Sequence, residues 1–479
     1  MSNFLKGSFI ANMLMNFASW IEKTWSCSEI GWLFTRNLND IKTRNSFIYK
    51  VISAPFEWIN SLSLSGRFAT LVNESVLLRT LSKYEYGVYL TVFLAPFIPT
   101  MACLGLVLLT FISFFIYRLQ NNTVKFNLDA VGFLIVSLVL IFGLFALTSL
   151  TPKSSIKIWF LYAPFIAFSY LIISAINTKQ RLRIVISLFV TAGFFVSLYG
   201  IYQQFFGKTD ANAWLDDKMF TEITVRVYST LENPNVLGEY LLLVIPLCAG
   251  MIYASKTFFA KFYYLIVLSA SILCMVFTQS RGCWVGLMLI AFIFAILVDK
   301  RLLTLGVLAV FTLPFVLPTS IITRFTSIGN INDSSTSYRV YIWLGTLNML
   351  KDFGLYGIGL GSDAYNKIYP FYSYSSILAP HAHNIYLQLL CETGIIGFFV
   401  FISSMIISIK KTFLGYLSDK NGLCGIICAA VIAGILGFLL QGAFDYVWYN
   451  YRVFLIFWMT LAIGIAARRV QNVKIDAHN

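Results

Sequence analysis

The chain has 479 residues, of which 58% are hydrophobic and only 12% are charged. An average soluble domain carries roughly 25% charged residues, so this chain has more apolar surface than a soluble core can bury. This composition excludes a soluble enzyme, a disordered chain and a secreted disulfide scaffold. The apolar runs are continuous, whereas the strands of a transmembrane β-barrel would alternate polar and apolar residues.

Apolar runs long enough to cross a bilayer, about 17–25 residues each, recur along most of the chain. They predict an all-α polytopic membrane protein with about twelve transmembrane helices. The first two predicted spans form one run that is broken at Pro96 and Pro99. The predicted spans are 86–99, 101–117, 128–148, 156–176, 184–205, 235–254, 262–279, 283–298, 302–318, 384–409, 423–443 and 453–467.

Residues 1–85 contain no predicted span. Trp20, Trp25, Trp32 and Trp58 stand there among charged and apolar residues, which is typical of amphipathic helices that lie on a membrane surface. A small soluble domain is the alternative, although the stretch is short for one. The expected organisation is a cytoplasmic or interfacial N-terminal region over 1–85, spans one to nine over 86–318, a large extracytoplasmic loop over 319–383, spans ten to twelve over 384–467 and a cytoplasmic tail over 468–479.

The net charge of +14 is spread unevenly over this topology. With the N-terminus in the cytoplasm, the cytoplasmic side receives roughly two thirds of the 35 Lys and Arg residues, while the acidic residues divide almost evenly. The basic excess therefore follows the positive-inside rule and does not indicate a nucleic-acid site. The even number of spans places both termini in the cytoplasm. The two long outer segments are then 206–234 and 319–383.

Two of the three His residues, His381 and His383, stand at the junction of the 319–383 loop and the tenth span. Pro380 before them suits a helix start, and Asn384 after them suits a helix N-cap. The positive end of a helix dipole favours a neutral imidazole, which can accept a proton. We therefore expect general-base chemistry. Helix capping or contact with lipid headgroups is the alternative, and a metal site would lack a third ligand beside this pair.

Three arginines are predicted on the same outer face, where basic residues are otherwise sparse. Arg226 precedes the sixth span, Arg281 lies in the break between the seventh and eighth spans, and Arg339 lies in the 319–383 loop. A guanidinium group pairs with phosphate through a planar fork of donors. Each arginine alone could instead extend to lipid headgroups. Together with the His pair, the three indicate a shared anionic ligand.

Further polar residues enter the spans from this face. Asn235 and Glu239 begin the sixth span, and Gln388 and Glu392 share one face of the tenth because they are four residues apart. Carboxylates inside a membrane are costly, so each is expected either to act in the site or to pair with an arginine. We predict no metal and no cofactor.

The stretch from His381 to Gly397 resembles the H-x-H-N…L-Q…E-x-G-x-x-G run of the bacterial O-antigen ligase and polymerase family. Other pieces follow in the family's order, so the resemblance covers about residues 128–467. They are Arg226 with Leu-Glu-Asn-Pro-Asn at 231–235, Thr-Gln-Ser-Arg-Gly at 278–282, Arg339 with Trp343, and Gly-Ile-Gly at 357–359.

This resemblance implies a membrane glycosyltransferase that moves a glycan from undecaprenyl diphosphate to an acceptor hydroxyl on a glycan, a lipid or a protein. The reaction would take place on the outer face of the bacterial cytoplasmic (inner) membrane, by one inverting displacement that needs no metal. His383 would be the base, and His381 would orient it or bind the acceptor. The diphosphate would bind Arg226, Arg281 and Arg339, supported by Asn235, Glu239, Asn384, Gln388 and Glu392.

A flippase for lipid-linked oligosaccharides, or another multi-span transporter, is the competing class. It would also have a dozen spans and outer arginines, but it should place ion-coupling carboxylates near the middle of the bilayer. The acidic residues here lie mostly at the outer ends of spans, which favours the transferase. Ligase and polymerase share a donor and differ only in acceptor, so both stay open.

Cysteine labelling tests the predicted orientation. A Cys introduced at position 210 or 375 should react with a membrane-impermeant thiol reagent added from outside. A Cys at 180 or 420 should not react, because the basic excess places these positions in the cytoplasm. Labelling of position 420 from outside would overturn the orientation and, with it, the argument for an outer-face donor.

Overall fold

The computed structural model describes residues 9–28, 46–62, 74–121, 129–207, 225–330 and 333–475. Within these ranges every regular element is a helix, which confirms the predicted all-α class. Eight of the described helices are long and apolar enough to cross a membrane. They are α9 (Thr100–Gln120), α11 (Pro152–Ala175), α12 (Lys179–Phe206), α13 (Pro234–Ala254), α14 (Phe258–Phe277), α20 (Ile385–Ser418), α21 (Leu423–Gln441) and α22 (Tyr451–Ile475).

Three apolar helices are shorter: α10 (Ala130–Leu147), α15 (Arg281–Leu297) and α16 (Arg301–Val316). The predicted first span is shorter still, because α8 (Tyr84–Leu94) gives way to a turn before α9. Pro96 and Pro99 lie in this turn, where their missing N–H groups cannot continue a helix. The total of about twelve spans therefore stays a prediction.

In the described part of the N-terminal region lie α2 (Phe9–Cys27), α5 (Phe47–Ser61) and α7 (Val76–Leu81). Glu22 of α2 accepts a hydrogen bond from Lys300, just after α15 ends (2.8 Å), and Tyr49 of α5 packs on Phe133 in the first turn of α10 (5.6 Å between ring centroids). Apolar side chains of α2 and α5, such as Trp20, are exposed. The predicted interfacial role of 1–85 stays a prediction, and Trp32 lies outside the described residues.

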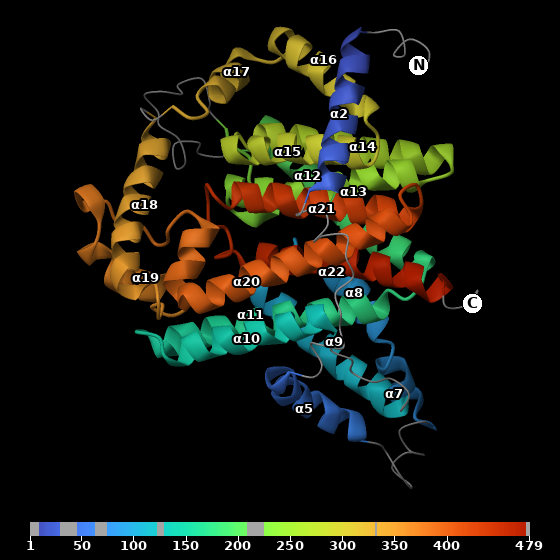
Figure 1. Cartoon of the computed structure of the whole chain (residues 1–479), viewed down its shortest axis with the longest axis vertical. Coiled ribbons are helices and arrows are strands. Elements are labelled where there is room, and N and C mark those ends of the chain that lie inside the picture. The colour runs from blue at the N-terminus through green and yellow to red at the C-terminus, as the bar shows by residue number, and fades with distance from the viewer. Residues whose placement is uncertain are drawn as a thin grey trace.

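Helices α13, α21 and α22 form the centre of the bundle, and the spans lie roughly side by side (Figure 1). Small residues on α21 let its neighbours approach closely, as they do in many membrane bundles. An added Cβ at Gly434 would meet Pro246 of α13, and one at Gly437 would meet Ile290 of α15. Because α13 is almost wholly buried, polar residues on it face protein and not lipid.

The stretch predicted as a large loop, 319–383, folds as a helical cap beyond one end of the spans (Figure 1). The cap contains α17 (Thr319–Thr326), α18 (Ser334–Phe353), α19 (Ser362–Ile368), η3 (Tyr369–Phe371) and η4 (Tyr374–Ser376). It has a small hydrophobic core, in which Ile342 and Met349 of α18 pack with Tyr365 of α19 and Cys391 of α20. The cap is therefore a folded unit that is continuous with α20.

The alternation of the spans brings several helix ends together under the cap. Helices α13, α15, α20 and α22 begin there, and α14 and α21 end there. We call this the cap end of the bundle and the opposite side the far end. The cap end carries five residues that lie up to 157 positions apart in the sequence: Arg226, Arg281, Arg339, His381 and His383. Most of the other predicted outer segment, 206–234, lies outside the described residues.

A break in α20 joins the cap to the bundle. Gly394 has φ 58° and ψ −171° inside the helix, which frees the carbonyl groups of Cys391 and Glu392. These carbonyls accept hydrogen bonds from the N–H groups of Ile358 (2.7 Å) and Gly359 (3.1 Å) in the cap. Irregular backbone inside a membrane-spanning helix is tolerated here because other protein groups satisfy its hydrogen bonds.

The break predicts a specific sensitivity at Gly394. A Cβ there would lie 2.4 Å from the carbonyl oxygen of Leu355, and its positive φ disfavours any other residue. We expect Gly394→Ala to cost about 1–3 kcal/mol and to lower the midpoint of thermal unfolding in detergent. The control Gly105→Ala, where an added Cβ meets no atom within 4 Å, should leave the midpoint unchanged. Identical midpoints for both variants would contradict this account of the break.

Candidate active site

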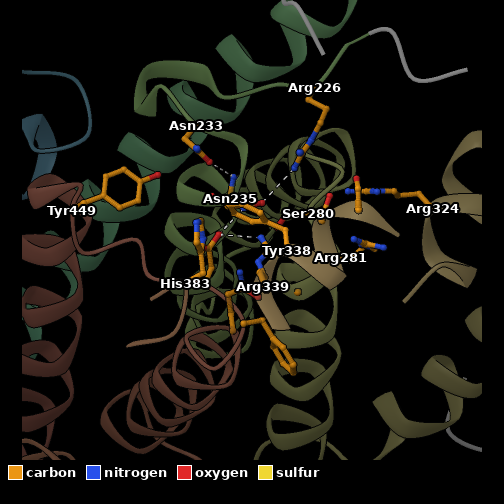
Figure 2. Close-up of a pocket in the computed structure, with 16 residues that line it drawn as sticks. Arg226, Asn233, Asn235, Ser280, Arg281, Arg324, Tyr338, Arg339, His383 and Tyr449 are labelled. Atoms are coloured by element: carbon orange, nitrogen blue, oxygen red, sulfur yellow. Dashed lines mark hydrogen bonds and ion pairs between the residues drawn. The ribbon is translucent and has the colours of Figure 1, made fainter. Parts of the chain in front are cut away.

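The helix ends under the cap enclose a polar pocket of about 480 Å³, which falls within the usual size range of small-molecule sites. Most of its lining is polar or charged (Figure 2). The lining residues are Arg226, Asn233, Asn235, Ser280, Arg281, Gly282, Arg324, Ser334, Ser335, Tyr338, Arg339, His383, Gln441, Phe444, Asp445 and Tyr449. Five of the residues predicted from the sequence thus meet in one place: Arg226, Arg281, Arg339, His383 and Asn235.

Arg226 precedes the start of α13, which Asn233 caps through a hydrogen bond to the N–H of Asn235 (2.8 Å). The Arg226 guanidinium donates to the carbonyl of Thr278 (2.9 Å) and to Oδ1 of Asn235 (3.3 Å). Burial, and then the positive charge of Arg339, lower the pKa of Arg226 to about 9. Arg226 therefore lies where positive charge is crowded and an anion would be stabilised.

Arg281 is the first residue of α15 and connects it to the cap. Its guanidinium donates to the backbone carbonyl and hydroxyl oxygens of Ser327 (3.1 Å each) and to the carboxylate of Asp333. Asp333 is fully buried and caps α18 by accepting from the N–H of Thr336 (3.2 Å). Burial alone would raise the pKa of Asp333, but the hydrogen bond and charge of Arg281 hold it below its usual value. Arg281 thus faces the pocket and also holds the cap in place.

A fourth arginine, Arg324 of α17, was not identified from the sequence. Its Nε donates to the carbonyl of Gln279 (3.4 Å), and burial followed by the charge of Arg281 lowers its pKa to about 9. Its predicted location on the outer side, where basic residues are few, is the signal that could have identified it.

The pocket has an excess of positive charge. The four arginines face two carboxylates, Asp445 in the pocket wall and Asp333 behind it. Asp333 pairs with Arg281, and Asp445 lies 3.6 Å from a guanidinium nitrogen of Arg339. The four guanidinium groups therefore outnumber the two carboxylates of this group. A site of this charge and polarity suits a divalent anion with several oxygen atoms.

His383 is bound to a buried carboxylate. Its Nδ1 lies 2.9 Å from Oδ1 of Asp445, which follows α21 and is 5% exposed. Oδ2 of Asp445 accepts a hydrogen bond from Nδ2 of Asn235 (2.6 Å). Burial alone would raise the pKa of Asp445, but the hydrogen bond from His383 and the charge of Arg339 hold it well below its usual range. Asp445 therefore stays ionised and assigns the proton of His383 to Nδ1.

The same pairing leaves Nε2 of His383 as a hydrogen-bond acceptor on a ring that lines the pocket. A His oriented by a carboxylate through Nδ1 is the arrangement that general bases use in hydrolases. Asp445 was not identified from the sequence. It lies at the outer end of a span, like Glu239 and Glu392, and this position is the only signal for it.

His381 lies behind His383 and does not line the pocket. Its Nδ1 accepts a hydrogen bond from the backbone N–H of His383 (3.3 Å), and its ring stacks on Tyr449 (5.2 Å between centroids). Burial, and then the nearby His383, lower the pKa of His381 to about 3, so this imidazole is neutral at physiological pH. His381 can therefore orient His383.

The backbone of His383 is itself constrained, with φ 45°, a value uncommon outside glycine. Asn384 caps α20 by accepting from the N–H groups of Tyr386 (2.9 Å) and Leu387 (3.0 Å). Its Nδ2 donates to the carbonyl of Ala443 (2.8 Å), two residues before Asp445. The N-cap predicted at Asn384 is present. Asn384 also connects the two backbone segments that carry His383 and Asp445.

Gln388 and Glu392 form a support behind the His pair. Oε1 of Gln388 accepts from the N–H of Ala382 (2.8 Å), between the two His residues, and its Nε2 donates to Oε1 of Glu392 (2.9 Å). Glu392 also accepts from the N–H of Gly361 in the cap (3.0 Å). Glu239 is fully buried in α13, and like Gln388 and Glu392 it is absent from the pocket lining. Across the described ranges, no three His, Cys, Asp or Glu side chains are grouped so that they could hold a metal ion.

Comparison with known families identifies one segment of the chain. Residues 265–402 match the family model described as O-antigen ligase, and this segment includes Arg281, Arg324, Arg339 and both His residues. No curated protein matches the chain. The family implies a glycosyltransferase-type enzyme, and together with the membrane-spanning helices it indicates a bacterial inner-membrane protein. The resemblance to the bacterial O-antigen ligase and polymerase family is therefore confirmed, over the segment 265–402.

Proposed function

We propose that the chain transfers a glycan from undecaprenyl diphosphate to an acceptor hydroxyl. The observation that carries this proposal is one pocket that holds Arg226, Arg281, Arg324 and Arg339 together with a His bound to an ionised Asp. The arginines match the diphosphate of the donor, and His383 matches the acceptor hydroxyl that must lose a proton.

The arginines act on the leaving group. The bond between the anomeric carbon and the diphosphate oxygen breaks, and negative charge grows on that oxygen. Fixed guanidinium groups placed before the reaction stabilise this charge better than water does, because they need no reorganisation. The leaving diphosphate is already a weak base, so the chain's own arginines can stabilise its departure without an acid catalyst.

His383 acts on the acceptor. The hydroxyl oxygen forms the new bond to the anomeric carbon, and its proton passes to Nε2 of His383. The resulting imidazolium is stabilised by Asp445, which does not itself need to take the proton. A single displacement of this kind inverts the anomeric configuration.

The arrangement of charge supports a site on the outer face of the membrane with both termini in the cytoplasm. Basic residues gather at the far end of the bundle, where Lys300 follows α15, Lys179 begins α12 and Lys411 lies near the end of α20. The positive-inside rule assigns such an end to the cytoplasm. The cap and its pocket then face outward, where lipid-linked glycans await transfer.

The general-base proposal is tested with His383→Ala. We expect glycan transfer to fall by at least about 100-fold, since general bases commonly contribute about 10²–10⁴-fold, while binding of the lipid-linked donor is retained. His381→Ala should be milder because its place can be taken by water. Asp445→Asn should approach the loss of His383→Ala, because an amide no longer assigns the proton to Nδ1. Near-full activity of His383→Ala in a purified, donor-saturated assay would contradict the assignment.

The arginine proposal is tested at Arg281. Lysine keeps the charge but lacks the fork of donors, so Arg281→Lys should retain part of the transfer activity and Arg281→Ala almost none. Thermal unfolding of both variants separates loss of donor binding from loss of the contact with Asp333. Arg469→Ala, an exposed arginine at the far end, is the matched control and should behave like the unmodified protein. Equal, near-normal activity of both Arg281 variants would assign this residue to structure alone.

The acceptor class within the proposal is read from a deletion strain. If the chain is a polymerase, its loss leaves one repeat unit on the final acceptor. If it is a ligase, its loss leaves the full polymer on the lipid carrier. A normal glycan pattern in the deletion strain would contradict both.

A further inference from the structure

A pair of stacked tyrosines lies on the cap beside the pocket. The rings of Tyr341 in α18 and Tyr374 in η4 are 5.5 Å apart with an angle of 14° between their planes. Tyr338, one helical turn before Tyr341, lines the pocket and meets the ring of His383 edge-on (6.0 Å between centroids). One face of α18 therefore leads from the proposed base to the stacked pair.

The backbone after Tyr374 is held in an unfavourable conformation. Ser375 and Ser376 have φ values of 53° and 57°, in the left-handed region that non-glycine residues rarely occupy, and two such residues in succession are unusual. Conformations of this kind persist where the surrounding structure imposes them, and they are concentrated at sites that hold a ligand. Here they present Tyr374, which is 47% exposed, against Tyr341.

The chemistry of this surface fits a sugar. Tyr341, Tyr374 and the exposed hydroxyls of Ser375 and Ser376 offer flat apolar faces and neutral hydrogen-bonding groups, and none of them carries a charge. A pyranose ring has the matching character, with C–H groups on one face and hydroxyls around its edge. A phosphate-bearing ligand would instead require the arginines on the other side of the pocket, where Figure 2 shows Arg281 and Arg324 across from His383.

We infer that the Tyr341–Tyr374 pair binds a sugar ring of the acceptor, so that the acceptor is a glycan and not a protein hydroxyl. This inference rests on the proposed function, because it assumes that the acceptor hydroxyl reaches His383. The acceptor enters over Tyr338, presents one hydroxyl to Nε2 of His383 and lays a following sugar on the stacked pair. The donor's diphosphate occupies the arginine side throughout.

The probe is the repeat-unit oligosaccharide, released by mild acid from the lipid-linked donor of the source strain. Transfer to this oligosaccharide is measured against its concentration with purified protein in nanodiscs. We expect Tyr341→Ala and Tyr374→Ala each to raise the acceptor KM by roughly three- to tenfold, the usual value of one aromatic contact, with the donor KM unchanged. Tyr341→Phe keeps the ring and should stay close to the unmodified protein. Tyr356→Ala, which removes another exposed tyrosine of the cap, is the matched control.

Two outcomes overturn the inference. An unchanged acceptor KM in the alanine variants, with lower stability or poorer membrane insertion, would make the pair an aromatic anchor at the membrane surface. A loss in Tyr341→Phe as large as that in Tyr341→Ala would exclude stacking as the cause.

Binding is measured separately, by saturation-transfer NMR of the same oligosaccharide on the His383→Ala protein. If the His383→Ala protein gives a signal that is lost in the Tyr341→Ala, His383→Ala double variant, the inference is supported. If the unmodified protein nevertheless shows no transfer, only the proposed function fails. Normal transfer with no effect at Tyr341 or Tyr374 removes the inference and leaves the proposed function standing.

Discussion

The site depends on one buried carboxylate, Asp445, that connects His383, Asn235 and Arg339. It accepts from His383 through one oxygen and from Asn235 through the other, and it lies within ion-pair distance of Arg339. These partners come from the starts of α20 and α13 and from the cap. A buried carboxylate is tolerated only when it is paired and hydrogen-bonded, so removing any one partner disturbs the others. Asp445 therefore positions the base and fixes the cap end of the bundle.

The crowding of arginines is the second constraint. Burial, and then the repulsion between like charges, lower the pKa values of Arg226 and Arg324, so this crowding costs free energy. Asp333 offsets part of this cost and ties Arg281 to the cap. Hydrogen bonds from Arg281 to Ser327 and Asp333 fix this side chain against the cap. The excess of arginines over carboxylates makes the pocket suited to bind an anion.

Much of the site could be predicted because its residues stand at helix ends. The even alternation of spans brings Arg226, Arg281 and His383 to one side, whatever the details of packing. Asp445 and Arg324 were missed, since each is a single residue without a motif, its role depends on tertiary contacts, and its predicted outer position is its only signal. Glu392 shows the same limit. Its i, i+4 relation to Gln388 follows from the sequence, but its bond to the cap backbone does not. The folded cap at 319–383 was expected only as a loop, because its core is shared with α20.

The most direct test of the account is a structure of the purified protein with its lipid-linked donor bound. We predict that the diphosphate lies among Arg226, Arg281, Arg324 and Arg339, with the anomeric carbon facing Nε2 of His383 and room for an acceptor over Tyr338. A diphosphate bound at the far end of the bundle, near Lys300, or a His383 directed away from the anomeric carbon, would contradict it.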